Sequence, residues 1–583
     1  MTFDPPIKHP ASDLVVEVKD LSTWFDTGRQ VIKAVDNMNL ALRRGRTHCI
    51  VGESGSGKSV TARSILNIVP KPGRIVKGEV LLHGAGTAST TIDLAKLHPK
   101  ARQIRAIRGR DISMIFQEPM SSLSPVHTIG QQIIETIRLH RPVGRKEARE
   151  RAIEMLAQVK IPRPERSIDS YPFEFSGGMR QRAMIAMALV CQPKLVIADE
   201  PTTALDVTTQ AEILDLMKSL QQRHGMALMF ITHDMGVVAE IADDVTVMYN
   251  GEVVEHGPVN DIFFAARHPY TQKLLASVRA LESRSHRAGP AAKSGSGDAI
   301  LEVSNLSMSF AGRRRMFSRK APEAPVKALD DVSFTLKRGE ILGIVGESGS
   351  GKTTLGRCIL RILAPSSGGI LFKGRDTAPV DLAPLPQAKV KPYWGRMRMI
   401  FQDPFSSLNP RMTVFQVIAE PLLNHGVTEK RVLEDQVAGL LERVGLASDA
   451  MWRYPHAFSG GQRQRIGIAR TIALRPELIV ADEATSALDV SLRAQMLDLL
   501  LGLAHEFEMS LIFIGHDIGV IRYMCDRVAV MHRGRIVEIG ETDTVCDKPS
   551  HPYTRSLISA IPKPDPRLRG KTERIRYMSE VES

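Results

Sequence analysis

The stretch GESGSGKS at residues 52–59 decides the fold, and it occurs a second time as GESGSGKT at 346–353. Both copies fit the pattern GxxxxGK[ST] of a phosphate-binding P-loop. In each copy an apolar run comes first (THCIVG and EILGIVG), and a helical pattern follows. Glycines let successive backbone N–H groups curl around an anion, and the positive end of the following helix faces the same place. The sequence therefore predicts two nucleotide-phosphate sites, each at the end of a strand.

The residues of the two loops have different expected roles on a bound nucleotide. Lys58 and Lys352 are expected to reach the β- and γ-phosphates, and Ser59 and Thr353 are expected to place a hydroxyl on Mg²⁺. The other candidate ATP-binding residues of the loops are Gly52, Ser54, Gly55, Gly57, Gly346, Ser348, Gly349 and Gly351. One match to the pattern could arise by chance, but two matches in the same strand-to-helix context are a strong signal.

The P-loop belongs to a repeat that covers most of the chain. IFQEPMSSLSP, FSGGMRQR, ADEPTTALDV, ITHD and HPYT recur, in order, as IFQDPFSSLNP, FSGGQRQR, ADEATSALDV, IGHD and HPYT. This period is far longer than that of a solenoid repeat. A whole α/β domain is therefore predicted twice, at 1–281 and 299–583. The Gly-, Ser- and Ala-rich stretch at 282–298 is interpreted as a flexible linker.

Two acidic residues end a short apolar run in each half, KLVIADE in the first and ELIVADE in the second. Such a run is typical of a buried parallel strand, whose carboxyl end is where sheets of this kind bind ligands. Asp199 and Asp482 are candidates for the Mg²⁺ shell. Glu200 and Glu483 are candidates for the base that orients and deprotonates water. Alone, these acids could be solvated residues at a strand end, but their position downstream of a P-loop favours catalysis.

FSGGMRQR at 175–182 and FSGGQRQR at 458–465 each precede a helical pattern. A Ser hydroxyl, Gly N–H groups and a helix N-terminus form a second surface suited to phosphate. A plain helix cap is the alternative, but it requires only the Ser and leaves the glycines and arginines unexplained. Met179 stands where the second half has Gln462, so one side-chain amide is missing. The candidate phosphate-facing residues are Ser176, Gly177, Gly178, Ser459, Gly460 and Gly461.

Composition narrows the class of protein without selecting a partner. The chain has 583 residues and a net charge of +13, enough length for two to four domains. Its basic surface is compatible with lipid head groups, nucleic acid or nucleotide, and the basic stretch 313–320 is interpreted as a solvated loop. The five cysteines show no CxxC and no metal-ligand spacing, so neither a disulfide framework nor a zinc site is expected. No secretory signal and no bilayer-spanning apolar run is visible.

P-loop, FQ, SGG, ADE, ALD and HD, in this order and twice, resemble the ATP-binding subunits of ABC transporters. GESGSGK, SSLSP or SSLNP, ALDV and HPYT are similar to the oligopeptide, dipeptide and nickel import branch, which includes fused peptide and glutathione importers. FSGGMRQR with TTALDVT resembles one of the two ATPase types that pair in this branch, and FSGGQ with SALDVS resembles the other. The resemblance implies two tandem RecA-like P-loop ATPase domains, with helical subdomains at about 118–193 and 403–476.

The resemblance also implies roles for residues outside the loops. Those residues are Gln117 and Gln402 for Mg²⁺ or water and for sensing the transmembrane partner, His233 and His516 for catalysis at the γ-phosphate, Asp206 and Asp489 for the seam between the halves, and Phe25 and Phe310 for adenine stacking. The halves would pack head to tail, so that each ATP lies between one P-loop and the Ser-Gly-Gly motif of the other half. ATP would hold the pair closed, and hydrolysis would release it.

The expected setting of the chain follows from the same resemblance. Its partners would be two transmembrane permease subunits and a periplasmic solute-binding protein, with no nucleic acid. It would lie peripherally on the cytoplasmic face of a bacterial inner membrane and use ATP and Mg²⁺. Some members of the branch hold an iron–sulfur cluster with cysteines beyond the HPY segment. No cysteine follows His551, so no cluster is expected here.

Two other functions are compatible with paired ATPase domains. A soluble twin ATPase acting on ribosomes or nucleic acid has a long charged helical linker, a coiled coil or a Cys-rich module, whereas residues 282–298 are short and Gly/Ser-rich. A sugar importer often lacks a catalytic residue in one half, whereas both halves here keep Lys, Asp, Glu, Gln and His. Import of peptides or peptide-like solutes is therefore favoured. The substrate itself is selected by another chain.

Overall fold

The computed structural model describes residues 13–28, 30–85, 90–118, 122–203, 205–282, 298–310, 326–403, 407–485, 488–571 and 573–577. The linker predicted at 282–298 lies almost wholly outside these residues, and the basic stretch 313–320 lies wholly outside them. The chain divides into two compact units. Unit 1 comprises Met1–Leu205, Thr209–Ala276 and Pro562–Glu573, and unit 2 comprises Asp206–Thr208, Ser277–Ile561 and Arg574–Ser583.

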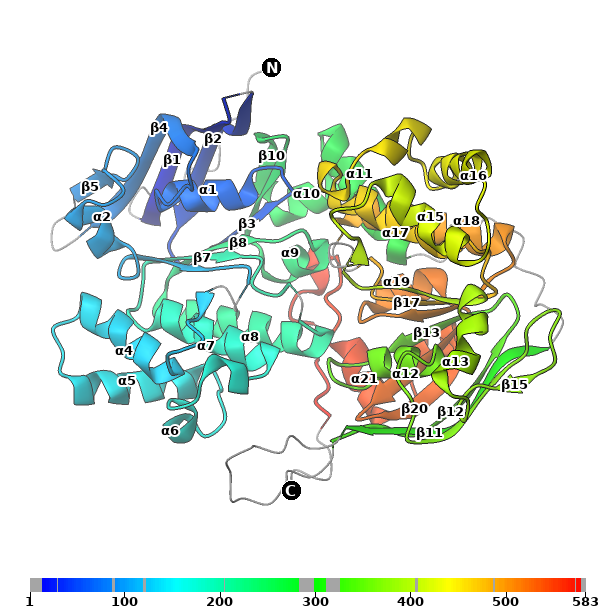
Figure 1. The fold of residues 1–583 in the computed structure, drawn as a ribbon. Coiled ribbons are helices and arrows are strands. Elements are labelled where there is room, and N and C mark those ends of the chain that lie inside the picture. Colours follow the sequence, from blue (N-terminus) through cyan, green and yellow to red (C-terminus); the bar gives the residue numbers. More distant parts are fainter. Residues whose placement is uncertain are drawn as a thin grey trace. The chain divides into compact units, whose positions relative to one another are not determined.

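Unit 1 contains an antiparallel sheet and a mostly parallel sheet (Figure 1). The first has the order β2-β1-β4-β5, formed by β1 (Leu14–Asp26), β2 (Val31–Arg43), β4 (Gly73–Ala85) and β5 (Thr90–Asp93). The second has the order β10-β9-β3-β8-β7-β6, formed by β3 (Thr47–Val51), β6 (Ile112–Ile115), β7 (Leu195–Asp199), β8 (Ala227–Ile231), β9 (Asp244–Tyr249) and β10 (Glu252–Pro258). Only β10 pairs antiparallel in this second sheet.

The helices of unit 1 fall into two groups within that unit (Figure 1). Those outside the segment between β6 and β7 are α1 (Lys58–Ile65), α2 (Arg102–Ile107), α8 (Val207–His224), α9 (Met235–Ile241), α10 (Val259–Phe264) and α11 (Pro269–Glu282); the start of α8 and the end of α11 are assigned to unit 2. Those between β6 and β7 are α4 (Ile129–His140), α5 (Arg145–Gln158), α6 (Pro164–Ser167), the short 3₁₀ turn η2 (Pro172–Glu174) and α7 (Gly177–Leu189). The described part of the range 118–193 therefore contains helices and no strand.

Unit 2 repeats both sheets. The antiparallel sheet has the order β12-β11-β14-β15, from β11 (Ala299–Phe310), β12 (Val326–Lys337), β14 (Ser367–Phe372) and β15 (Val380–Asp381). The other sheet has the order β16-β17-β18-β13-β19-β20, from β13 (Ile341–Val345), β16 (Met397–Ile400), β17 (Leu478–Asp482), β18 (Ser510–Ile514), β19 (Arg527–His532) and β20 (Arg535–Glu541). The same order of corresponding strands confirms the prediction of two tandem α/β domains.

The helices of unit 2 follow the same plan. They are α12 (Lys352–Ile359), α13 (Gln387–Val390), η4 (Lys391–Gly395), α15 (Val414–Asn424), α16 (Lys430–Arg443), η5 (Ser448–Trp452), η6 (Pro455–Ala457), α17 (Gly460–Ile472), α18 (Val490–Glu506), α19 (Ile518–Met524), α20 (Thr542–Asp547) and α21 (Pro552–Ser559). Thr128 and Thr413 begin α4 and α15 with the same capping box, in which the side chain of the third helical residue returns a bond to the cap.

The central strands explain why the motifs converge at one edge. All five residues of β3, of β7 and of β8 are buried, as are those of β13, β17 and β18. Strands that are buried along their whole length are typical of a parallel sheet that is covered on both faces. Since parallel strands end at the same edge, the loops that follow β3, β7 and β8 lie together. This edge therefore holds the P-loop, the ADE carboxylates and the HD motif of unit 1.

The segment Pro562–Glu573 belongs to unit 1, although the residues on both sides of it belong to unit 2. The segment Pro562–Glu573 contains the 3₁₀ turn η7 (Pro566–Leu568), which packs against α9 and α10. The Arg569 guanidinium donates to the carbonyl oxygens of Ile241 at 3.1 Å and Ala242 at 3.0 Å, at the end of α9. The Arg567 guanidinium lies 4.4 Å from the centre of the Phe264 ring. Unit 1 thus includes a segment that follows most of unit 2 in the sequence.

A polar triad, with His48 and Thr246 buried and His256 exposed, distinguishes the two mostly parallel sheets. In unit 1 the Thr246 hydroxyl lies 2.8 Å from His48 Nε2 and 3.0 Å from His256 Nδ1, and the two imidazole rings stack with centroids 5.4 Å apart. Unit 2 has Leu342, Ala529 and Ile539 at the corresponding positions. Burial lowers the pKa of His48 to about 3, and His256 and Arg46 add to this shift. The folded state therefore requires a neutral His48.

Acid is expected to destabilise unit 1 through His48. Its pKa is lowered on folding, so its contribution is fully present above the unfolded pKa of about 6.5 and is lost as the pH falls from there towards 3. The free energy of unfolding should drop by about 2 kcal/mol between pH 7 and pH 5. Urea unfolding at the two pH values measures it. His48→Leu should flatten this dependence, whereas His98→Leu, at an exposed position, should not; equal slopes in parent and His48→Leu would contradict the assignment.

Candidate active site

The P-loops of both units fold as the sequence predicts, because two glycines leave no room for a side chain. A Cβ atom on Gly52 would lie 2.2 Å from the carbonyl oxygen of Met248, and one on Gly57 would lie 2.2 Å from that of Ala34. Gly57 also has a left-handed φ of +102° as it starts α1. Gly346 and Gly351 are confined in the same way in unit 2. The loop therefore passes close to neighbouring backbone before the helix begins.

The lysine of each P-loop lies inside the loop. Lys58 Nζ donates to the carbonyl oxygens of Gly52 at 2.8 Å and Glu53 at 2.7 Å. Lys352 makes the corresponding bonds in unit 2, at 2.7 and 2.8 Å. Both side chains are buried, and burial lowers the pKa of Lys352, although nearby carboxylates beginning with Glu483 oppose the shift. Each loop thus places one cation on its concave side, where a phosphate would bind.

In each unit, the residue that follows the P-loop lysine has a hydroxyl group that is hydrogen-bonded to a carboxylate. Ser59 Oγ donates to Asp199 Oδ1 at 2.9 Å, and Thr353 Oγ1 donates to Asp482 Oδ1 at 3.0 Å. Burial raises the pKa of both aspartates, and the hydroxyl bond opposes part of that shift. Both carboxylates end a buried strand, β7 or β17, and are almost fully covered. These hydroxyl and carboxylate oxygens are hard donors of the kind that Mg²⁺ prefers.

The glutamate that follows each aspartate is held by an amide and an imidazole. In unit 1, Glu200 Oε2 accepts from Gln117 Nε2 at 2.9 Å, and Oε1 lies 3.3 Å from His233 Nδ1. In unit 2 the matching distances from Glu483 are 2.6 Å to Gln402 and 3.3 Å to His516. Gln117 and Gln402 therefore lie beside the catalytic candidates of their own halves.

The backbone and charge of these glutamates are also unusual. Glu200 and Glu483 have left-handed φ angles of +47° and +46°. Such strain in a non-glycine residue is sustained only where the surroundings fix it, and it concentrates at functional sites. Burial acts to raise the pKa of each carboxyl, but the histidine bond and nearby cations outweigh it and lower the pKa. Both carboxylates therefore stay ionised at neutral pH, as acceptors for a proton from water.

The predicted residues thus lie together in each unit, in separate sets of hydrogen bonds, and the lysine interacts electrostatically with both carboxylates. The structure brings together Lys58, Ser59, Asp199, Glu200, Gln117 and His233 in unit 1, and Lys352, Thr353, Asp482, Glu483, Gln402 and His516 in unit 2. Thr203 was not among the predicted residues, although its hydroxyl donates to Glu200 Oε2 at 3.0 Å. The TT of ADEPTTALDV was the only signal for it in the sequence.

The Ser-Gly-Gly motifs begin α7 and α17. Ser176 Oγ accepts from the N–H of Met179 at 3.3 Å, and Ser459 Oγ accepts in the same way from Gln462. Among the described residues, neither serine is bonded to the P-loop group of its own half. The neighbouring arginines have structural partners: Arg180 donates to the carbonyl oxygen of Pro172, and the buried Arg182 donates to that of Val159. These arginines therefore form hydrogen bonds within the helical subdomain.

The two helices that begin with the Ser-Gly-Gly motifs, α7 and α17, differ in one hydrogen bond at their first turn. Gln462 Oε1 accepts from the Ser459 N–H at 3.0 Å, which completes a capping box in α17. Met179 lacks an amide, so α7 has the serine half of the box alone. Met179→Gln is expected to close the box and to change ATP turnover by about tenfold at most, because one net hydrogen bond contributes about 0.5–1.5 kcal/mol. Steady-state ATPase assays check this, with Gln462→Met as the reciprocal variant; a gain far above tenfold would contradict it.

The other predicted residues are Asp206, Asp489, Phe25 and Phe310. Asp206 Oδ1 accepts from the Thr208 hydroxyl at 2.8 Å, and Asp489 is the cap residue of α18. Phe25 lies in β1, where its ring covers Gly73 of β4 and is half-buried. Phe310 ends β11 and is 43% exposed, so its face is open to a stacking partner. Their predicted seam and adenine roles stay predictions.

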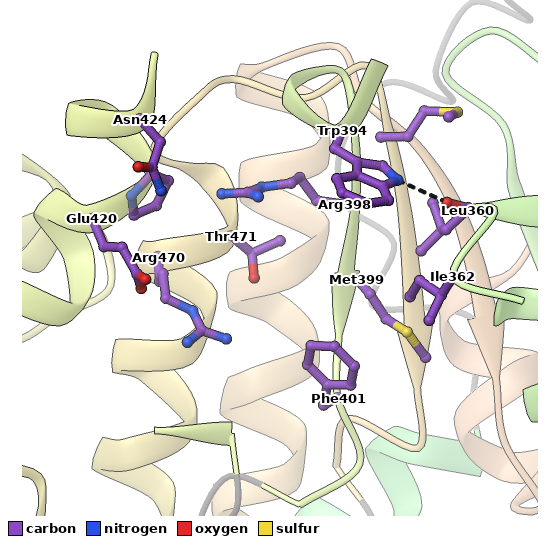
Figure 2. A pocket seen from close by; sticks show the side chains of 12 residues that line it. Leu360, Ile362, Trp394, Arg398, Met399, Phe401, Glu420, Asn424, Arg470 and Thr471 are labelled. Carbon is purple, nitrogen blue, oxygen red and sulfur yellow. Dashed lines mark hydrogen bonds between the residues drawn. The ribbon is translucent and has the colours of Figure 1, made fainter. Parts of the chain in front are cut away.

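A groove of about 350 Å³ lies beside Gln402 in unit 2 (Figure 2). Phe401 and Ile362 form its apolar side, and both are more than one-third exposed. Arg398 and Arg470 line it from β16 and α17, and Glu420 of α15 lies beside Arg470 (Figure 2). Arg470 donates to the Ser407 carbonyl oxygen at 2.9 Å. The groove therefore spans the boundary between the P-loop core and the helices at 403–476.

Paired P-loop groups of this composition, each with a helical insertion before its ADE strand, define a tandem ATPase. The model of the ABC transporter family matches residues 35–203 and 329–486, and that of the oligopeptide/dipeptide transporter C-terminal region matches 254–315 and 537–581. The chain therefore belongs to the ABC transporter family, as its sequence motifs predicted.

Similar proteins extend over the whole chain. The glutathione import ATP-binding protein GsiA of Salmonella paratyphi A is 48% identical over 98% of this chain and 93% of its own length. GsiA of Escherichia coli K12 is 47% identical with the same coverage. The dimeric ATP-binding cassette MJ0796 in a post-hydrolysis state aligns with 42% of this chain and 99% of its own, at 25% identity and a TM-score of 0.37.

These matches support an ATPase of the import type, and they give no support to the ribosomal, nucleic-acid or sugar-import alternatives. In the part of the chain that the structure describes, no helix is long and apolar enough to cross a membrane.

Proposed function

We propose that the chain hydrolyses ATP to power the import of peptides or peptide-like solutes, with glutathione as the first candidate, across a bacterial inner membrane. Family membership and the oligopeptide/dipeptide C-terminal region support the transport role, and the GsiA relatives suggest the solute. The observation that carries the ATPase role is the ionised glutamate held between Gln and His beside a buried Asp in both units.

The proposed roles of the site residues follow their geometry. Glu200 and Glu483 accept the proton of the attacking water, since each carboxylate has an oxygen held by an amide and another beside an imidazole. His233 and His516 orient that carboxylate and reach the γ-phosphate. The P-loop lysines and N–H groups bind the phosphate chain. In each half, the glutamate, glutamine and histidine are already in contact with one another, so these side chains do not need to move far for the reaction.

A Mg²⁺ site fits the oxygen donors that each unit provides. Ser59 with Asp199, and Thr353 with Asp482, already place a hydroxyl and a carboxylate within hydrogen-bond distance behind the lysine. When bound with ATP, Mg²⁺ would neutralise phosphate charge. Gln117 and Gln402 would complete the oxygen shell through their side-chain carbonyls.

The Ser-Gly-Gly motifs serve the ATP of the opposite half in this proposal. Ser176, Gly177 and Gly178 would complete the site of Lys352, and the second motif would complete that of Lys58. The lack of a bond between either described serine and its own P-loop supports this assignment. The domain limits 1–281 and 299–583 remain our proposal for the two repeated copies.

The proposed partners are two permease subunits and a periplasmic solute-binding protein, which would hold the chain peripherally at the cytoplasmic face of the membrane. We propose the groove beside Gln402 as the contact of unit 2 with a permease. Exposed Phe401 and Ile362 offer apolar contact, and Phe401 directly precedes the glutamine bonded to Glu483. A permease segment in the groove would thus lie one residue from the catalytic group.

The decisive experiment reconstitutes the chain with its permeases in lipid nanodiscs. ATP hydrolysis is then measured with solute-binding protein that is empty or loaded with glutathione, dipeptides, oligopeptides or a monosaccharide. Stimulation by glutathione or a peptide supports the proposal. Stimulation by the monosaccharide alone, or by ribosomes and not by the permease complex, contradicts it. The Glu200→Gln/Glu483→Gln double variant controls for contaminating ATPases.

A further inference from the structure

The HPYT motif makes the same contact in both units. The N–H of Glu53 in the first P-loop donates to the hydroxyl oxygen of Tyr270 at 3.1 Å, and that of Glu347 in the second donates to Tyr553 at 3.1 Å. The partners are 217 and 206 residues apart in sequence. The hydroxyl of each HPYT tyrosine thus reaches the loop that binds ATP, a contact that the proposed function does not yet use.

The rest of the motif fixes where the tyrosine points. His268 Nδ1 accepts from the Tyr270 N–H at 3.2 Å, and His551 Nδ1 accepts from the Tyr553 N–H at 3.1 Å, so each histidine caps its helix. Proline is the first residue of both α11 and α21, where its fixed φ suits a helix start. The tyrosine is consequently the second helical residue, on a rigid first turn.

A glutamate from the neighbouring strand anchors this turn. The Glu255 carboxylate accepts from the N–H groups of Arg267 at 2.7 Å and His268 at 3.2 Å. Glu538 makes the corresponding bonds to Ser550 and His551 in unit 2, at 2.8 and 3.1 Å. The helix start is therefore tied to β10 or β20, beside the sheet that carries the P-loop.

The P-loop residue that meets the tyrosine also meets the lysine. The Glu53 carbonyl oxygen accepts from Lys58 Nζ at 2.7 Å, while its N–H is bonded to Tyr270. Further along the loop, the carbonyl oxygen of Ser56 accepts from the N–H of Gly251 at 3.1 Å. Two residues from later in the chain thus hold the loop: Gly251 bonds to Ser56, and Tyr270 bonds to Glu53, the residue that also bonds to the lysine.

The tyrosines are supported by packing on their other side. The Tyr553 ring is 2% exposed and lies 4.2 Å from the His532 ring, and the Tyr270 ring lies 4.4 Å from that of Tyr249. Burial and the nearby Glu347 carboxylate raise the pKa of the Tyr553 phenol, so its hydroxyl stays neutral. A neutral, immobile hydroxyl is suited to hold a backbone N–H.

We propose that Tyr270 and Tyr553 are positioning residues for ATP binding, each acting on the P-loop of its own half. The tyrosine hydroxyl holds the backbone N–H of Glu53 or Glu347 in place. It thereby also positions the carbonyl oxygen of that residue, which accepts a hydrogen bond from the P-loop lysine until a phosphate binds. Without the hydroxyl, part of the population would hold a loop unable to bind, which raises the apparent Kd in proportion. The proposal concerns nucleotide binding and does not depend on the solute transported.

The experiment measures mant-ATP binding to the full chain with one site silenced. Lys352→Ala leaves the first P-loop as the reporter, and Lys58→Ala leaves the second. Tyr270→Phe is expected to raise the Kd for mant-ATP about fivefold to tenfold in the Lys352→Ala background, and to leave it unchanged in the Lys58→Ala background. Tyr553→Phe should show the opposite pattern. In the otherwise unchanged chain, KM for ATP should rise while kcat stays within about twofold.

Matched controls separate the hydroxyl from ring packing. Tyr249→Phe and Tyr577→Phe remove a hydroxyl from rings that pack on Tyr270 and Tyr553, and neither should alter the Kd. The melting temperature without nucleotide should stay within about 2 °C of the parent for the Tyr270→Phe and Tyr553→Phe variants. An unchanged Kd in these variants would overturn the proposal. An equal rise in Kd in the control variants, or a rise explained by a fall in melting temperature, would also overturn it.

Discussion

Glu200→Gln and Glu483→Gln, made one at a time, are each expected to lower the ATP turnover of the full chain by about 100-fold or more. Glutamine keeps the size and the hydrogen bonds of the side chain, but it cannot accept a proton from water. Neither glutamate substitutes for the other, because each carboxylate is ionised and held by Gln and His in its own unit. In the proposed closed pair, an ATP that is not hydrolysed at one site would also keep the pair closed and so stop turnover at the other site. Phosphate release measured at saturating ATP checks the prediction.

The control for these variants is Glu252→Gln, an exposed residue of β10, which should turn over ATP like the parent. Binding of mant-ATP should persist in both active-site variants, because the P-loop lysines are intact. A normal rate in one of the two would show that the halves are not equivalent catalysts, contrary to the symmetric arrangement proposed here.

Lys58→Ala and Lys352→Ala are expected to weaken ATP binding at their own site by about 100-fold. Each removes the one side-chain cation inside its P-loop, and a hydrogen bond to a charged group contributes about 1.5–3 kcal/mol. Removal also leaves two inward carbonyl oxygens with no ammonium partner in each loop. Equilibrium binding of mant-ATP measures the loss.

Lys146→Ala is the matched control, since that lysine lies on the exposed first turn of α5. The single variants should retain one binding event per chain, and the double variant should retain none. Stoichiometric binding of two nucleotides in Lys58→Ala would show that the loop grips the phosphates through its N–H groups alone.

The P-loop and the central strands could be predicted because local sterics dictate them. Gly52 and Gly57 tolerate no Cβ atom, and β3 and β7 are continuous buried runs of the kind typical of a covered parallel sheet. Parallel strands then bring Asp199 and His233 to the edge that holds the loop. Family resemblance added Gln117, and the structure places its amide on Glu200.

Other features depended on contacts that no short pattern encodes. The bond between Tyr270 and Glu53 joins residues 217 positions apart, so HPYT could be used only as a family marker. The positive charge of Arg182 suggested a phosphate contact. In the structure this side chain is buried, donates to the carbonyl oxygen of Val159 and forms an ion pair with Glu212. The contact of His48 and His256 with Thr246 could not be predicted from the sequence either, because the two histidines lie on different strands and have no metal-ligand spacing.

The membership of Pro562–Glu573 in unit 1 has a consequence for the order of synthesis. A ribosome makes the strands of unit 1 before those of unit 2, yet the Arg569 bonds to Ile241 and Ala242 need residues that follow the strands of unit 2. Domains fold as units, N-terminal first, while the chain is being made. Unit 1 therefore folds first without these contacts and acquires them only after the strands of unit 2 have been made.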